Sequence, residues 1–351
     1  MHYPDLTEVK KVLVIKMRHH GDVLLTSPVF SNLRRALPNA IIDAMVYQET
    51  TPMLEGHPAI RQFLSYDRGW KKLGWGRKLA KEFALLRRVR KEGYDLVINL
   101  TEGDRGAIVA LVSGARVRVG FDPQGGGFLG KKRIYTHVVK TCKTPRHTVE
   151  KNLDALRRIG IFPGPDERDL YFAFSEEDRS RALQLLQGVE SYLLLHPVSR
   201  WRFKCLPTDK VAELIKQLHA KGEKIVMTAS PDAQEMAMVE EILAKVPHIP
   251  VINLAGKISL KELGALIAMS KALICVDSVP LHLSSALQVP VVALFGPSSE
   301  INWGPWRNSR ARVVTQPFSC RPCFMDGCGG SKKSDCLSTL PVARIIDAIP
   351  I

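Results

Sequence analysis

The chain has 351 residues, of which 45% are hydrophobic, and a formal net charge of +15. This length can fill two domains of ordinary size, each with its own hydrophobic core. No apolar run approaches the roughly 20 residues of a membrane-spanning helix, and the N-terminus, MHYPDLTEVKK, lacks the apolar centre of a signal peptide, which predicts a cytoplasmic or peripheral protein.

The excess of positive charge lies in the first part of the chain. Residues 1–146 contain 26 Lys and Arg against 13 Asp and Glu, whereas residues 147–351 contain 24 against 22. A basic field confined to one domain indicates an anionic partner, such as nucleic acid, an acidic membrane surface or a phosphorylated glycolipid. The sequence has no recognition-helix or RNP-type motif, which argues against nucleic acid.

The first predicted βα unit is residues 12–29, VLVIKMRHHGDVLLTSPV. An apolar β-branched run is followed by a polar turn that ends at Asp22, and then by a helix with Pro28 in its early turns. Open parallel sheets bind ligands beyond the carboxyl ends of their strands, where Asp22 would lie. A carboxylate at a helix N-terminus among basic side chains favours its ionised form and can accept a proton from a bound hydroxyl. The alternative is an N-cap aspartate that only closes the helix.

Strands and helices alternate through the rest of the first half. We expect strands at 41–46, 61–65, 95–100 and 116–121, which predicts βαβ units and a parallel sheet. The turn that contains Arg105 follows another carboxyl end and can line the same cleft as Asp22. Residues 125–127 are glycines without a helix at phosphate-binding spacing, so we interpret them as a loop.

Residues 68–91, RGWKKLGWGRKLAKEFALLRRVRK, carry ten basic residues against Glu82 alone. This composition suits a helix that lies at the headgroup level of an anionic bilayer. Alternatively, the helix is solvated and packs Phe83 and Leu86 into the core. Both interpretations remain open on the sequence. The aromatic and aliphatic residues that interleave with the basic ones are Trp70, Leu73, Trp75, Leu79, Phe83 and Leu86.

Residues 161–169, IFPGPDERD, interrupt the periodicity, and we place the domain boundary between residues 165 and 166. A second α/β series follows, with strands expected at 192–195, 224–228, 250–254, 272–276 and 289–295. The final helix, expected at 341–349, can pack back on the N-terminal domain. The sequence therefore predicts two doubly wound domains, 1–165 and 166–351.

Two segments of the second half carry candidate binding chemistry. In HPVSRWRFKCLP, the side chains of Ser199, Arg202 and Lys204 follow a strand and precede a helix, an arrangement that can cradle a diphosphate. In VDSVPLHLSSALQVPVVALFGP, a strand ends at Asp277 and a short turn at Ser278 opens a helix. Ser278 and backbone N–H groups of that helix can hold phosphate oxygens. The alternatives are a surface basic loop, an N-cap aspartate and, at His282, a core histidine.

The four cysteines at 320, 323, 328 and 336 have ligand-like spacing in CRPCFMDGCGGSKKSDC. Such a C-x-x-C followed by two further cysteines can bind a structural zinc ion. The alternative is free or loosely paired thiols, which an odd total of seven cysteines favours. The candidate ligands are Cys320, Cys323, Cys328 and Cys336.

Three of these motifs resemble bacterial lipopolysaccharide core heptosyltransferases, closest to the heptosyltransferase III type. KMRHHGDVLLTSP resembles the family pattern (K/R)-x-x-x-x-GD-x-x-x-(T/S)-x-P. HPVSRWRFKCLP resembles H-(P/A)-x-(S/T)-x-x-x-K-x-W-P, although Leu206 replaces the tryptophan and the loop is one residue longer, so Lys204 and Arg202 both remain candidates for the phosphate ligand. The segment from Val276 to Pro297 matches the family pattern at nearly every position, and the resemblance covers nearly the whole chain.

The resemblance implies a GT-B type glycosyltransferase, with two Rossmann-like domains facing each other across a cleft. The C-terminal domain would bind ADP-L-glycero-D-manno-heptose, and the basic N-terminal domain would bind the inner-core heptose region of lipopolysaccharide at the cytoplasmic face of the inner membrane. The implied reaction is inverting, with Asp22 as the base and no metal or other cofactor. The implied donor ligands are Ser199, Arg202, Lys204, Asp232, Glu235, Gly256, Asp277, Ser278 and His282, and the candidate acceptor ligands are Lys16, Arg18, His19, His20 and Arg105.

Two other classes of protein are alternatives to this one. A metal-dependent hydrolase would use Asp22 with His19 and His20, but adjacent histidines point in different directions and no third ligand has suitable spacing. A catalytically inactive relative that only binds the sugar nucleotide is a closer alternative. Donor binding without transfer would identify such a protein.

Overall fold

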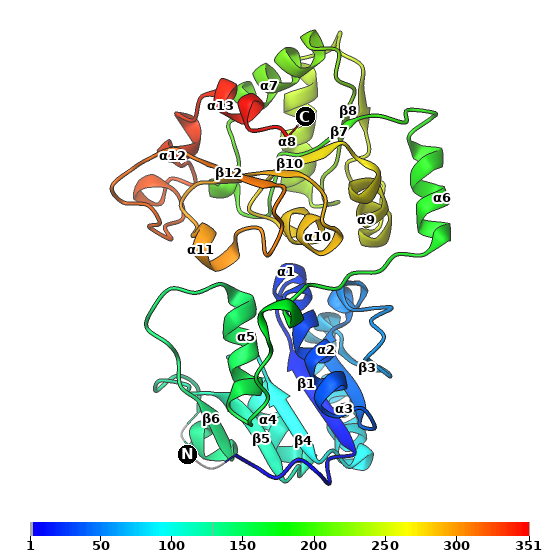
Figure 1. Ribbon diagram of the computed structural model, residues 1–351, viewed down its shortest axis with the longest axis vertical. Coiled ribbons are helices and arrows are strands. Elements are labelled where there is room, and N and C mark those ends of the chain that lie inside the picture. Colours follow the sequence, from blue (N-terminus) through cyan, green and yellow to red (C-terminus); the bar gives the residue numbers. More distant parts are fainter. Residues whose placement is uncertain (1–2, 129, 351) are drawn as a thin grey trace. The chain divides into compact units, whose positions relative to one another are not determined.

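The computed structural model describes residues 3–128 and 130–350, and the chain divides into two compact units, Met1–Phe172 and Ala173–Ile351 (Figure 1). Each unit contains one six-stranded sheet in which every strand pairing is parallel. The predicted two-domain α/β architecture is therefore confirmed. Among the described residues, no helix is both long and apolar enough to span a membrane.

The sheet of the first unit has the strand order β3-β2-β1-β4-β5-β6. Helix α2 packs on α5, and α3 packs on α4. Right-handed crossovers place these two pairs on opposite faces of the sheet. The strands are β1 Lys11–Lys16, β2 Ile41–Tyr47, β3 Phe63–Tyr66, β4 Leu96–Asn99, β5 Val117–Phe121 and β6 His137–Val139, and the helices are α1 His20–Leu24, α2 Ser27–Ala36, α3 Trp75–Glu92, α4 Asp104–Ser113 and α5 Thr148–Arg157.

The sheet of the second unit has the order β12-β11-β10-β7-β8-β9, which is the same winding. Its last helix, α13, packs on α7 of the same unit. The strands are β7 Leu193–His196, β8 Ile225–Met227, β9 Val251–Asn253, β10 Ala272–Val276, β11 Val291–Phe295 and β12 Ala311–Thr315. The helices are α6 Glu176–Leu185, α7 Thr208–Ala220, α8 Ala233–Ala244, α9 Leu260–Met269, α10 Val279–Leu287, α11 Glu300–Trp303, α12 Asp335–Ser338 and α13 Val342–Asp347.

The central strands are apolar because helices cover both faces of each sheet. In β1, β7 and β10 nearly every residue is buried, with the sequences KVLVIK, LLLH and ALICV. All ten predicted strands are present. Two further strands, β6 and β12, were missed because each lies at a sheet edge, where a short or half-exposed strand lacks a continuous apolar run.

Each sheet has one point where the direction of winding reverses. It lies between β1 and β4 in the first unit and between β7 and β10 in the second. Crevices outside the carboxyl ends of strands at such switch points are the usual ligand sites of open α/β sheets. Asp22 in the first unit, and Lys204 and Asp277 in the second, therefore belong to segments at a switch point.

Candidate active site

Asp22 lies at the switch point of the first unit, in the first turn of α1. The sequence predicted a turn here, and the structure contains the short helix α1 within it. The Asp22 side chain is half-buried. Its charge stabilises the ammonium form of Lys16 nearby. A carboxylate is favourable at this end of a helix because unpaired backbone N–H groups point toward it.

Lys16 is the last residue of β1, and its side chain links the loops that follow β1 and β4. Its side chain is buried, and Nζ donates hydrogen bonds to Leu100 O at 3.1 Å and to Asn152 Oδ1 at 3.3 Å. Burial lowers the pKa of Lys16, while the charge of Asp22 opposes that change. The Met17 N–H donates to Thr101 Oγ1 at 2.8 Å, which adds a second link between the loops. Lys16 thus orients the turn that carries Asp22, and its contact with an acceptor stays a prediction.

Asn152 was not singled out from the sequence, although it completes this arrangement. It lies on α5, is buried, and its Nδ2 donates to Leu25 O at 3.0 Å, at the junction of α1 and α2. Asn152 therefore bridges Lys16 and the end of α1. The signal that could have found it is a polar residue on the apolar face of α5, beside Val149, Leu153 and Leu156.

The other predicted acceptor ligands of this turn differ in exposure. Arg18 and His19 are exposed, and His19 is the N-cap residue of α1. His20 is less accessible, because its Nε2 hydrogen-bonds Glu49 O at 2.8 Å and burial lowers its pKa. His20 thus links the Asp22 turn to the segment that contains Glu49, and contact of Arg18 and His19 with an acceptor stays a prediction.

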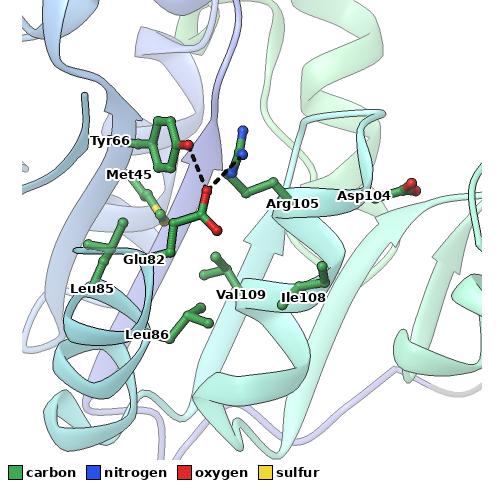
Figure 2. Close-up of a pocket in the computed structure, with 9 residues that line it drawn as sticks. All are labelled: Met45, Tyr66, Glu82, Leu85, Leu86, Asp104, Arg105, Ile108 and Val109. Atoms are coloured by element: carbon green, nitrogen blue, oxygen red, sulfur yellow. Dashed lines mark hydrogen bonds and ion pairs between the residues drawn. The ribbon is translucent and has the colours of Figure 1, made fainter. Parts of the chain in front are cut away.

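Arg105 lines a cavity of about 370 Å³ between α3 and α4 (Figure 2). Its guanidinium carbon lies 4.0 Å from the ring centroid of Tyr66, and its Nη2 lies 3.3 Å from Glu82 Oε1. The Tyr66 hydroxyl donates to the same carboxylate oxygen at 2.8 Å. Burial, and then the hydrogen bond to Glu82, raise the pKa of Tyr66 to about 12. Arg105 is thus already engaged by Glu82, and its contact with an acceptor stays a prediction.

An ion pair joins the two candidate motifs of the second unit. Lys204 Nζ lies 2.6 Å from Asp277 Oδ2, and the two side chains are 20% and 6% exposed. Lys204 belongs to the loop after β7 and Asp277 directly follows β10, so the pair bridges the switch point. Arg202, the other candidate for the phosphate, is exposed, whereas Ser199 is buried and its hydroxyl accepts the Trp201 N–H at 3.3 Å.

Ser278 precedes α10 without capping it. Its hydroxyl donates to Val276 O at 3.2 Å rather than accepting a hydrogen bond from the first turn of the helix. Pro280 in that turn has no N–H, so Val279 is the first backbone donor there. His282 is buried on the same helix. This arrangement leaves the start of α10 suited to an anion.

The loops after β8 and β9 lie at the same carboxyl edge and hold the remaining predicted donor ligands. Asp232 caps α8 by accepting the Gln234 N–H at 2.9 Å, and the buried Glu235 accepts the Ser230 N–H at 3.0 Å. Gly256 has a φ of +69°, which favours glycine, and its N–H donates to Ala229 O at 3.0 Å. These hydrogen bonds hold the backbone of each loop in place. Contact of these residues with the nucleotide stays a prediction.

The four cysteines of the predicted zinc motif are free thiols. Cys320 and Cys328 are exposed, whereas Cys336 is buried, and burial raises its pKa. In residues 3–128 and 130–350, no group of three or more histidine, cysteine or acidic side chains is arranged to hold a metal ion. The zinc site that the spacing allowed is therefore not assembled in the described structure.

Two buried histidines give the fold a testable dependence on pH. His57 in the first unit and His196 at the end of β7 are both buried, and burial lowers the pKa of each to about 4 from 6.5.

Both histidines are neutral in the fold, so the unfolded state takes up more protons below pH 6.5. Their contribution to the free energy of unfolding is therefore constant above that pH and falls between pH 6.5 and about 4. We expect a loss of about 2 kcal/mol per histidine at pH 5, measured by urea unfolding. Replacing His57 or His196 with glutamine should make the free energy of unfolding depend less steeply on pH, by the equivalent of up to one proton taken up on unfolding. An unchanged dependence on pH would contradict this account.

Comparison with known proteins identifies the family. The sequence pattern of Glycosyltransferase family 9 (heptosyltransferase) matches residues 82–333. The chain is 33% identical to an Escherichia coli protein named lipopolysaccharide heptosyltransferase 3, over 95% of this chain and 96% of that protein. It is 35% identical to a protein of the same name from strain K12, over 83% of each. The structure of E. coli ADP-heptose lps heptosyltransferase II has a TM-score of 0.77 and 24% identity, covering 96% of this chain and 97% of that one. On these grounds, the chain belongs to glycosyltransferase family 9, the heptosyltransferases.

Proposed function

We propose that this protein transfers heptose from ADP-L-glycero-D-manno-heptose to the inner-core heptose region of lipopolysaccharide. The observation that carries the proposal is the relationship, over nearly the full length of both chains, to a protein named lipopolysaccharide heptosyltransferase 3. The positions of the main candidate residues support it, because Asp22 and the Lys204–Asp277 pair lie at the switch points of two sheets with the same strand order. Membership of a glycosyltransferase family also favours this function over a nucleic-acid-binding one.

Asp22 is the proposed base in the first unit. It would take the proton of the acceptor hydroxyl while that oxygen attacks the anomeric carbon of heptose. The bond from the anomeric carbon to the diphosphate breaks on the opposite side, so the configuration inverts and ADP leaves. The hydrogen bonds of Lys16 and Asn152 support this role, because they fix the turn in which Asp22 lies.

The second unit would hold the diphosphate and neutralise its growing charge. Lys204 has three N–H donors, so it can contact a phosphate oxygen while it keeps its hydrogen bond to Asp277. The exposed Arg202 and the start of α10 offer further positive charge and N–H groups. With these groups in place, we propose that no metal ion is required.

The proposed independence from metal predicts that EDTA leaves the rate of transfer unchanged. The measurement compares initial rates of ADP release after dialysis with and without EDTA, and then with added Mg²⁺ or Zn²⁺. A rate that falls by about tenfold or more with EDTA and recovers with one metal would overturn this part of the mechanism.

The acceptor is tested with purified lipopolysaccharides of defined truncation, each incubated with ADP-heptose under single-turnover conditions. We expect transfer to one truncation only, because a site built around particular hydroxyl groups rejects acceptors that lack them. Mass spectrometry of the product then identifies the modified heptose. Binding of ADP without transfer to any truncation would instead indicate a catalytically inactive relative.

A further inference from the structure

The outer face of α3 carries large apolar side chains that the fold leaves in contact with solvent. Trp75, Leu79 and Phe83 are spaced four residues apart and are 81%, 52% and 69% exposed. Side chains at this spacing lie on one side of a helix. The suggestion that Phe83 packs into the core is therefore wrong, whereas Leu86 is partly buried and packs against the core of the first unit, as that interpretation expected. The three side chains form a continuous apolar stripe, which we call the α3 stripe.

Exposed apolar side chains also occur on the neighbouring helix. Helix α4 packs beside α3, and its residues Ile108 and Leu111 are also exposed. Ile108 and Leu86 both line the cavity between the two helices (Figure 2). Apolar surface of this extent on a charged domain marks an interaction site.

Exposed basic residues lie beside the α3 stripe on the same helix. Arg77, Arg87 and Lys91 are exposed on α3, and none of them forms an ion pair within the described part of the chain. The one acidic residue among positions 68–91 is Glu82. It forms an ion pair with Arg105 and accepts a hydrogen bond from the Tyr66 hydroxyl. The helix therefore presents an apolar side and a basic side to its partner.

We propose that α3 docks this protein on an anionic lipid bilayer, with the α3 stripe in the boundary between headgroups and acyl chains. Amphipathic helices with aromatic and aliphatic residues on one side and Lys and Arg on the other bind lipid surfaces in this way. The long basic side chains reach the phosphates while their methylene stems stay with the apolar layer. Charge disfavours a second copy of this chain as the partner, because its α3 would bring the same positive field to the contact.

The place of α3 in the sheet supports the same partner. Helix α3 follows β3, so its first residue, Trp75, lies toward the carboxyl edge of the sheet. The Asp22 turn lies at the same edge. A docked α3 would bring that edge close to the bilayer. The relevance of this orientation rests on the proposed function, because the acceptor proposed there is a membrane glycolipid. The proposal that α3 binds lipid does not rest on it.

The test measures co-sedimentation of the full chain with vesicles. We expect binding to vesicles of phosphatidylcholine with phosphatidylglycerol, and little binding to phosphatidylcholine alone. Replacing Trp75, Leu79 and Phe83 together with serine should weaken binding at least about tenfold. The matched control replaces three exposed apolar residues elsewhere, Phe162, Leu183 and Ile301, with serine and should bind like the wild type.

The contribution of charge is tested with Arg77, Arg87 and Lys91 changed to glutamine. We expect a loss of about fivefold per charge at low salt, whereas the same change at the exposed Lys216, Lys221 and Lys224 of the second unit should have little effect. Thermal unfolding and ADP binding verify that each variant is folded.

Equal vesicle binding by the wild type and the serine variant would overturn the proposal, as would the absence of binding by the wild type. A wild type that is dimeric by sedimentation equilibrium, with a monomeric serine variant, would assign α3 to self-association instead. None of these measurements depends on transferase activity, so failure of this inference and failure of the proposed function can be told apart.

Discussion

Replacing Asp22 with alanine is expected to lower the turnover number of heptosyl transfer by a factor of about 10² to 10⁴. Without the carboxylate, the acceptor hydroxyl must lose its proton to water while it attacks the anomeric carbon. The affinity for ADP should hardly change, because the proposed diphosphate ligands belong to the second unit. The measurement is single-turnover transfer, with ADP affinity from titration calorimetry.

Two control variants separate chemistry from structure in this experiment. Asp22→Asn keeps the size of the side chain and should be nearly as inactive as the alanine variant. Glu8→Ala removes an exposed acidic side chain elsewhere in the first unit and should retain wild-type turnover. Loss of a favourable charge in the first turn of α1 costs stability only on the order of 0.3–1 kcal/mol. Turnover within about threefold of the wild type in Asp22→Ala would reduce Asp22 to a residue that only places a favourable charge in the first turn of α1.

Replacing Lys204 with alanine is expected to weaken binding of ADP-heptose by roughly 10- to 100-fold. A hydrogen bond from an ammonium to a charged group contributes about 1.5–3 kcal/mol, and this contact with the diphosphate would be lost. The variant also leaves Asp277 as a buried carboxylate without its ammonium partner, which should reduce the free energy of unfolding by about 3 kcal/mol. Titration calorimetry and urea unfolding measure the two effects separately.

The double variant Lys204→Ala with Asp277→Asn resolves these two effects. Removing both charges should recover most of the lost stability, since no unpaired buried charge remains, while donor binding should stay weak. Arg202→Ala is the matched test of the other phosphate candidate, because Arg202 is exposed and lies in the same loop. A larger loss of affinity in Arg202→Ala than in Lys204→Ala would transfer the main phosphate contact to Arg202.

Much of the fold follows from local sequence patterns. The apolar runs of the central strands are long and continuous because the sheets are covered on both faces, and such runs can be recognised without tertiary information. The motifs around Asp22, Lys204 and Asp277 could also be placed at the ends of strands. The edge strands β6 and β12 could not, because exposure on one side removes the apolar signal.

The sequence by itself thus determined the two α/β series, the confinement of positive charge to the first half, and which loops carry the candidate chemistry. Only the tertiary structure decided what individual side chains contact. It buried Lys16 against Leu100 and Asn152, and it paired Lys204 with Asp277. It also left the aromatic residues of α3 exposed. The physical reason is that strand and helix patterns depend on neighbours along the chain, whereas burial and hydrogen-bond partners depend on segments that meet only when the sheet has formed.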